Sequence, residues 1–179
     1  MRILIFVLAL SGITLSLIGG EFIDTYLFSK SCIDETVNSV TANGSVFLKN
    51  STILDSVVVN GALLSIESDL GSLQVNGEAK LEHSAIKGDA LINGALKAEK
   101  CHFFGSLSIA SEMTFLENAT TIQILIRKTS HLNSGQILKL SGKTIIHGDI
   151  VFESGKGQVF VTDDVEIVGN VIGGCVVQK

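Results

Sequence analysis

The dipeptide Asn-Gly recurs at a regular spacing in this 179-residue chain. It stands at residues 43–44, 60–61, 76–77 and 93–94. Asn-Gly between apolar runs is the strongest short-range signal for a β-hairpin. A hairpin at 76–77, however, would place Glu78 and Lys80 on the same face as Val75 and Leu73. The pattern therefore predicts a corner, Asn43-Gly44 and its repeats, where the chain bends and continues; both residue types tolerate left-handed backbone angles.

Apolar residues flank each corner with a period of two. Alternate residues of a strand share one face, so the positions two and four residues before and after the glycine are predicted to point inward. Around Gly44, Gly61, Gly77 and Gly94, and with Ser111 in the next glycine position, these are Val40, Ala42, Val46, Leu48, Val57, Val59, Leu63, Ser65, Leu73, Val75, Ala79, Leu81, Ala90, Ile92, Leu96, Ala98, Leu107, Ile109, Met113 and Phe115. Nearly all of them are apolar, as one continuous core requires.

Further corners complete each unit. Gly71, Gly88 and Gly105 are evenly spaced between the Asn-Gly pairs. Small or polar residues stand at a third corner; they are Ser51, Ser68, Ser84, Cys101 and Asn118. Three short strands and three corners make one coil of a β-solenoid. One coil buries too little apolar surface to offset the ordering of its backbone, so the coils must stack.

The repeat returns after a polar segment at 127–134. Gly148 and Gly169 are flanked by apolar residues, and 154–157 is predicted to be a loop inserted at a corner. We therefore expect an all-β, single-stranded parallel β-helix of about seven or eight coils, with 16–21 residues per coil, over residues 40–179. Residues 21–39 lie outside the repeat, and the spacing of Phe22, Ile23, Tyr26 and Leu27 favours a short helical cap.

The first 20 residues have the pattern of an export signal. Arg2 precedes an apolar run that ends at Ile18, and Gly19-Gly20 provides small residues before Glu21. A signal peptide at 1–20 predicts a periplasmic, cell-surface or secreted protein. A retained membrane anchor is the alternative, because Ile18 is a poor residue three places before the cleavage point.

Composition excludes some partners. The net charge is −5, and no run of Lys or Arg occurs, so nucleic acid is not an expected partner. The mild negative charge also disfavours an acidic membrane surface, which leaves the N-terminal segment as the only route to a membrane.

No catalytic, cofactor-binding or metal-binding group is recognisable in the sequence. Asp163-Asp164 is predicted to be a solvated corner, and the outward positions carry no carboxylate cluster; they are Phe47, Leu64, Lys80, Lys97 and Thr114. The histidines occupy different positions of the coil; they are His83, His102, His131 and His147. The cysteines have no metal-site spacing, and their odd number leaves a thiol or an intermolecular bridge; they are Cys32, Cys101 and Cys175.

Two surface features suggest a partner. The corner asparagines stack, either as a polar recognition stripe or as an internal amide ladder; they are Asn43, Asn60, Asn76 and Asn93. Apolar residues in outward positions or near the C-terminus form a possible assembly or partner surface, unless residues 21–39 cover part of it; they are Phe47, Val58, Leu64, Leu91, Val171, Ile172, Val176 and Val177. Unpaired strand edges at a solenoid end favour end-to-end association.

The glycine-punctuated coils, such as Val75 to Leu81 and Ile146 to Phe152, resemble those of the bactofilins, the polymer-forming cytoskeletal family of bacteria. The resemblance covers roughly residues 40–177 and implies a right-handed β-helix that polymerises end to end without nucleotide. This chain departs from the family in its export-like start and its lack of proline. The expected function is an exported, self-associating structural scaffold without catalytic activity. The alternatives are a monomeric surface-binding or adhesion module and, least favoured, an enzyme acting on polysaccharide.

Overall fold

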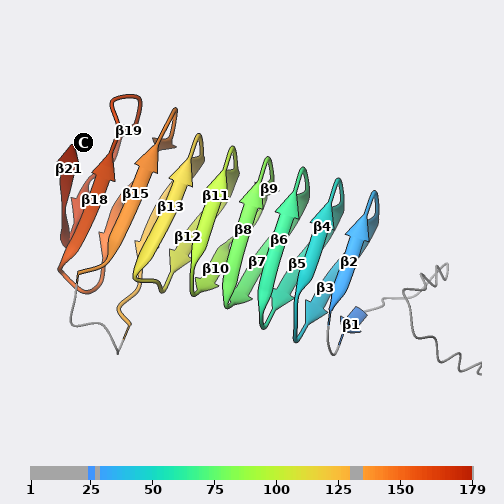
Figure 1. Cartoon of the computed structure of the whole chain (residues 1–179). Helices are drawn as coiled ribbons and strands as arrows, with labels where there is room; N and C mark the ends of the chain where they lie inside the picture. Colours follow the sequence, from blue (N-terminus) through green and yellow to red (C-terminus); the bar gives the residue numbers. More distant parts are fainter. Residues whose placement is uncertain (1–23, 27–28, 130–134, 179) are drawn as a thin grey trace, which may run out of the picture.

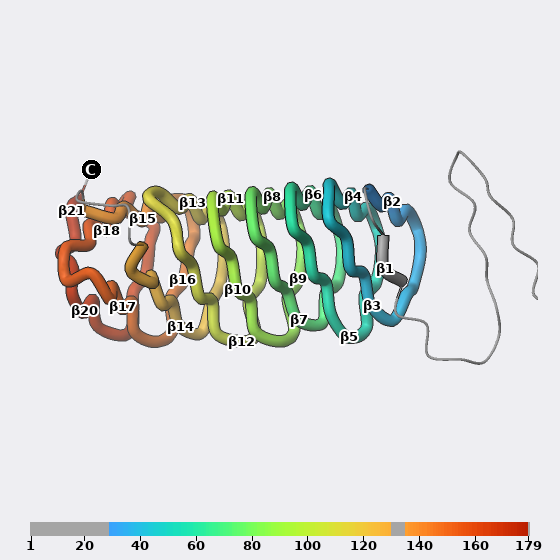
Figure 2. Tube along the Cα trace, turned by 90° about the horizontal axis from the view of Figure 1, so that it is seen from below, coloured from blue at the N-terminus to red at the C-terminus, as the bar shows by residue number. Residues whose placement is uncertain are grey.

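The computed structural model describes residues 24–26, 29–129 and 135–178. These residues form two long parallel sheets whose coils stack along one axis (Figure 1). Nine strands on one side correspond to about eight coils. The chain trace shows each coil lying beside the next (Figure 2). The prediction of an all-β parallel solenoid is confirmed.

One strand of each coil belongs to the nine-stranded sheet. Its members are β2 (Lys30–Ile33), β4 (Val46–Lys49), β6 (Ala62–Ile66), β8 (Glu78–Glu82), β11 (Leu96–Glu99), β13 (Met113–Glu117), β15 (Ile137–Ser141), β18 (Gly157–Val161) and β21 (Gly174–Gln178). The order in the sheet follows the order in the chain, because each coil adds one strand to the edge of the last.

The rest of each coil belongs to the twelve-stranded sheet. Its members are β1 (Asp24–Tyr26), β3 (Thr36–Ala42), β5 (Thr52–Val59), β7 (Asp69–Asn76), β9 (Ala85–Ile86), β10 (Ala90–Asn93), β12 (His102–Ile109), β14 (Thr120–Ile126), β16 (Ile145–Ile146), β17 (Ile150–Phe152), β19 (Glu166–Ile167) and β20 (Val171–Ile172). Long strands such as β5 bend midway, where the register shifts between Ile53 and Ser56. Two of the three predicted segments therefore share one sheet, and the corner between them is a bend.

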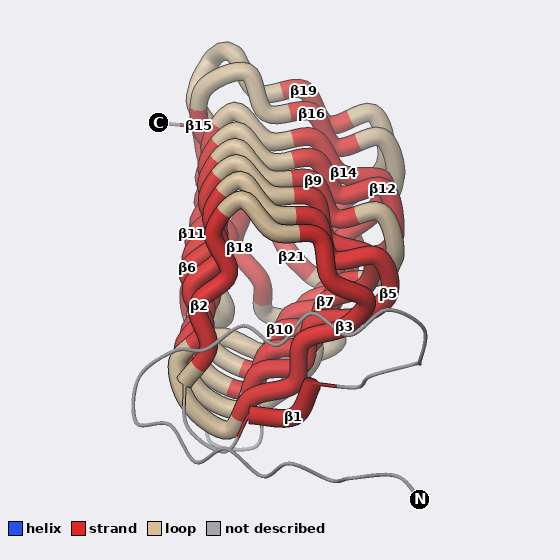
Figure 3. Tube along the Cα trace, turned by 90° about the vertical axis from the view of Figure 1, so that its right-hand side faces the viewer, coloured by secondary structure: helices blue, strands red, loops and turns tan. Residues whose placement is uncertain are grey.

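The inward columns follow the strand ladders. Val46 pairs with Leu63, which pairs with Ala79, and all three are buried. Viewed along the rod, the corners of successive coils lie over one another (Figure 3). Successive side chains of a strand point to opposite faces, so each inward residue is followed by a residue that faces outward. The core is therefore a set of parallel columns enclosed by the two sheets.

The inward prediction for Met113 and Phe115 is wrong. Leu96 pairs with Thr114 and Ala98 pairs with Leu116, so Thr114 and Leu116 point inward, and Phe115 is 40% exposed. One additional residue lies in the corner before β13. The Ser111 hydroxyl accepts the Met113 N–H at 3.2 Å and accommodates that residue in a tight turn. The insertion shifts the alternation by one, which exchanges the two faces.

The stacking begins before the predicted boundary at residue 40. Strand β2 pairs with β4, and β3 pairs with β5 from Thr36 onward. Residues 24–26 form a strand beside β3 rather than part of a helix. The described part of 21–39 is therefore solenoid instead of a helical cap. Phe22, Ile23, Leu27 and the predicted signal peptide at 1–20 lie outside the described residues.

At the expected Asn-Gly corner, Gly77 and Gly94 have positive φ of 150° and 146°. The non-glycine residues with left-handed φ occupy a different corner. They follow the strands of the nine-stranded sheet, one per coil, and are Asp34, Asn50, Glu67, His83, Lys100 and Asn118, with φ of 46–57°. None of the corner asparagines 43, 60, 76 and 93 is among them. In each coil, the residue with this backbone angle turns the chain into the next strand, and its side-chain type differs from coil to coil.

Candidate functional site

The described part of the chain contains no group of three or more His, Cys, Asp or Glu residues that could hold a metal ion. His83 lies at a left-handed corner, and His102 stacks on Phe104 with ring centroids 6.2 Å apart. His147 lies at another corner, and His131 is outside the described residues. Asp163 and Asp164 form an exposed turn before β19. Among the described residues, the structure does not bring these side chains into one group.

The corner asparagines form an exposed ladder of side-chain amides. Asn60 Nδ2 donates to Asn43 Oδ1 at 2.7 Å, Asn76 donates to Asn60 at 2.6 Å, and Asn93 donates to Asn76 at 2.6 Å. The next two positions of this column are Ala110 and Arg127, and the Arg127 guanidinium reaches past Ala110 to donate to Asn93 Oδ1. The amides thus bond to one another, which favours the structural interpretation of the stripe.

The glycines of the bend stack directly on one another. A side chain on Gly105 would overlap the backbone of Gly88, and one on Gly71 would overlap Asp55. Gly148 and Gly169 belong to this column, because Gly169 lies against Gly148 and Gly148 against the carbonyl of Ile122. They are equivalent to Gly105 and lie in a different column from the Asn-Gly glycines. Close approach of backbones favours glycine in this column, although Ile122 stands between Gly105 and Gly148.

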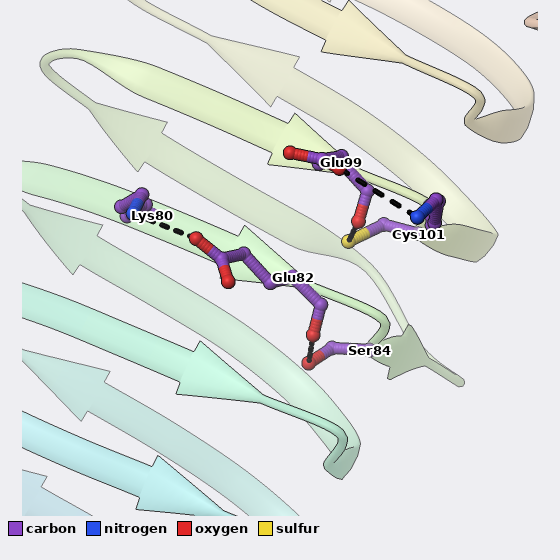
Figure 4. A network of polar contacts seen from close by, with 6 residues as sticks. Lys80, Glu82, Ser84, Glu99 and Cys101 are labelled. Atoms are coloured by element: carbon purple, nitrogen blue, oxygen red, sulfur yellow. Dashed lines mark hydrogen bonds and ion pairs between the residues drawn. The ribbon is translucent and has the colours of Figure 1, made fainter.

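A column of buried hydroxyls lies behind the left-handed corner. The Ser51 and Ser68 N–H groups donate to the hydroxyls of Ser68 and Ser84 in the next coil, at 3.2 and 3.3 Å. Each hydroxyl donates in turn to the carbonyl two residues earlier, as Ser84 does to Glu82 at 2.9 Å. Cys101 takes the next position and donates to Glu99 at 3.3 Å (Figure 4). The column satisfies corner backbone groups that burial would otherwise leave unpaired.

Burial raises the pKa of the Cys101 thiol from 9.0 to about 11, because the thiolate would lie away from water. The stability contributed by the neutral thiol is fully present below pH 9, and it is lost as pH rises through 11. About 3 kcal/mol of unfolding free energy corresponds to this shift. We expect Cys101→Ser, which preserves the hydrogen bond, to remove most of the stability loss between pH 9 and 11 in urea titrations. Cys175 is exposed, so Cys175→Ser should leave the loss of stability between pH 9 and 11 unchanged. The same dependence of unfolding free energy on pH in both variants would contradict the role of Cys101.

One outer column of the nine-stranded sheet consists mainly of apolar and basic residues. It runs through Ser31, Phe47, Leu64, Lys80, Lys97, Phe115, Lys139, Phe160 and Val177. Lys80 forms an ion pair with Glu82 at 2.6 Å, and the Lys139 ammonium lies 5.0 Å from the Phe115 ring centroid. The predicted surface residues Phe47 and Leu64 are therefore neighbours, and Phe115 takes the outward position expected for Thr114.

A groove of about 930 Å³ lies over the N-terminal end of this face. Its apolar lining includes Ile33, Phe47 and Leu64, and its charged lining includes Lys30, Glu35, Glu78 and Lys80. The strands β2, β4, β6 and β8 supply these side chains, except that Glu35 lies between β2 and β3. Sequence reasoning identified Phe47 and Leu64 but not the groove, because its outline depends on how the first coils stack.

The other predicted surface residues lie on two different faces. Val58 and Leu91 share an outward column with Gln74 between them, and Ile172 ends that column. Val171 and Val176 occupy inward positions of the last coil. Additional exposed apolar residues lie at the bend in some coils; they are Leu54, Phe104, Ile122 and Val168. The sequence offered no signal for these residues, since the position changes residue type between coils.

The last described coil is not covered on its outer side. Val176 continues the column of Val46, Leu63 and Val159, and it is 50% exposed whereas Val159 is fully buried. Val165, Ile167 and Val171 are only partly buried against the core. Strands β19, β20 and β21 pair on one side only among the described residues. This end combines apolar side chains with unpaired backbone groups.

Comparison with family models, with curated proteins and with solved structures found no match. Among the described residues, no helix has the length and hydrophobicity needed to cross a bilayer.

Proposed function

We propose that the protein is an exported structural scaffold that associates with copies of itself through its C-terminal coil. The observation that supports this is the exposure of Val176 in a column whose preceding member, Val159, is fully buried. A coil added in register would cover Val171 and Val176 and would supply hydrogen-bond partners for β20 and β21. The gain combines apolar burial with backbone pairing, which is the same interaction that joins coils within the chain.

A scaffold role without catalysis is supported by how the titratable side chains are distributed. The described histidines lie in separate parts of the coil. The amide ladder and the hydroxyl column use polar side chains to bond one coil to the next. Export is proposed from the signal-like pattern of residues 1–20, and polymer formation is consistent with the resemblance to the bactofilins.

Sedimentation velocity and negative-stain microscopy of the purified protein test this proposal. We expect the wild type to associate in a concentration-dependent manner and Val176→Lys to remain monomeric, because an ammonium at the end of the apolar column would be desolvated by a second copy. Val151→Lys is the matched control. Val151 is a half-buried valine near the same end, but it points outward from β17; this variant should associate like the wild type.

Two results would contradict the proposal. One is a wild-type protein that stays monomeric over the accessible concentration range. The other is a Val176→Lys protein that is folded by circular dichroism and associates as the wild type does.

The groove over β2–β8 favours a second candidate function, a monomeric binding or adhesion module. Its apolar floor and charged lining suit a small amphipathic or extended ligand. Binding to a glycan array or a cell surface that is lost in Leu64→Lys, with a wild type that stays monomeric, would support this candidate over the scaffold.

A further inference from the structure

We propose that Asn43 is a site of spontaneous deamidation, and that the amide ladder protects Asn60, Asn76 and Asn93 from the same reaction. All four asparagines are exposed and precede a glycine. The sequence therefore makes them equally vulnerable, and only the structure distinguishes them.

The reaction needs water and no other co-reactant. The backbone nitrogen of the glycine attacks the asparagine Cγ, and glycine has no side chain to hinder this approach. The new N–Cγ bond forms as the Cγ–Nδ2 bond breaks, and ammonia leaves with the proton from the glycine nitrogen. Water then opens the five-membered imide and gives aspartate or isoaspartate. The reactive geometry requires the asparagine side chain to turn toward its own backbone, and so to leave the ladder.

The ladder has a direction, which makes its members unequal. Each amide nitrogen donates to the oxygen of the preceding coil, so Asn60 and Asn76 each donate one bond and accept one. Asn93 donates to Asn76 and accepts from the Arg127 guanidinium. Asn43, among the described residues, only accepts. Turning Asn43 breaks one of these bonds, whereas turning any other member breaks two, one of them charge-assisted at Asn93.

The aspartate product also fits only at Asn43. A carboxylate there accepts the Asn60 amide as the original oxygen does. A carboxylate at Asn60 would lose the donor to Asn43 and would set two oxygens at the 2.7 Å separation of the present hydrogen bond. Conversion of Asn43 to aspartate therefore adds a negative charge without disturbing the ladder, and conversion of Asn60 to aspartate breaks it.

Incubating the folded full-length chain in H₂¹⁸O at mildly alkaline pH, followed by peptide mass spectrometry, tests the proposal. We expect Asn43 to incorporate ¹⁸O about fivefold faster than Asn60 and Asn76, the effect of one additional hydrogen bond, with Asn93 slowest. The chain unfolded in urea is the control, where the four sites should react at similar rates. Equal rates in the folded chain, or a faster reaction at Asn60 or Asn76, would overturn the proposal.

Two sets of variants test the mechanism. Arg127→Ala should raise the rate at Asn93 by about tenfold, by removing a charge-assisted bond, and leave Asn43 unchanged. Asn43→Asp should keep the wild-type melting temperature, and Asn60→Asp should lower it. An unaltered rate at Asn93 in folded Arg127→Ala, or an equal loss of stability in the two aspartate variants, would overturn the role given to the ladder.

Discussion

Replacing Gly71 by alanine is expected to destabilise the fold by about 3 kcal/mol or more. A Cβ at this position would overlap the carbonyl oxygen of Asp55 and would come within 2.7 Å of the carbonyl oxygen of Leu54. Both are backbone atoms of the preceding coil, and the pairs on either side of the bend, Ile53 with Leu70 and Ser56 with Ser72, hold this segment against Gly71. No flexible side chain can move aside, so the two coils must separate locally and lose pairing on either side of the bend.

Gly88 provides the matched control in the next coil of the same column. An alanine Cβ there would lie 3.2 Å from the Gly71 oxygen, a tight contact that a small shift relieves. We expect Gly88→Ala to cost about 1 kcal/mol. Urea unfolding followed by circular dichroism gives both values. Similar losses in the two variants would show that backbone contact does not explain the need for glycine at Gly71.

Replacing Leu107 by alanine is expected to cost about 3 kcal/mol. Leu107 is fully buried and lies between Ala90 and Ile124 in an inward column of the twelve-stranded sheet. Removing its isobutyl group leaves a cavity between coils, because strand ladders on both sides prevent the backbone from collapsing inward.

Leu91 is the matched control for Leu107. It has the same side chain in the neighbouring coil, but it points outward from β10 and is only half-buried. Leu91→Ala should cost about 1 kcal/mol or less. The same unfolding measurement compares the pair. A loss at Leu91 as large as that at Leu107 would contradict the assignment of inward and outward columns.

The proposed association depends on the same principle as these two predictions, which is that a coil is stabilised by its contacts with neighbouring coils. Each coil is stabilised by a neighbour on either side, and the last described coil has a neighbour on one side only. Val176 and Val171 lie where Val159 and Ile150 lie one coil earlier, yet they are less buried. In the proposed association, a second copy supplies this neighbour.

Sequence analysis predicted the coil and most of its core because both depend on local alternation. Val75, Ala79 and Leu81 flank an Asn-Gly pair with period two, and all three are buried. The prediction failed at Met113 and Phe115, where one extra residue in the corner changed the phase. It also failed to assign left-handed angles to the corner that follows the nine-stranded sheet, because residues as different as Glu67, His83 and Lys100 adopt them there.

The sequence by itself determined the solenoid, since the alternation of a strand and the spacing of corners are properties of a single coil. Only the tertiary structure decided how the side chains and backbone of one coil contact those of the next. It set the direction of the amide ladder, the overlap that excludes a side chain at Gly71, and the exposure of Val176. These features depend on the register between coils, which backbone hydrogen bonds establish between residues a whole coil apart.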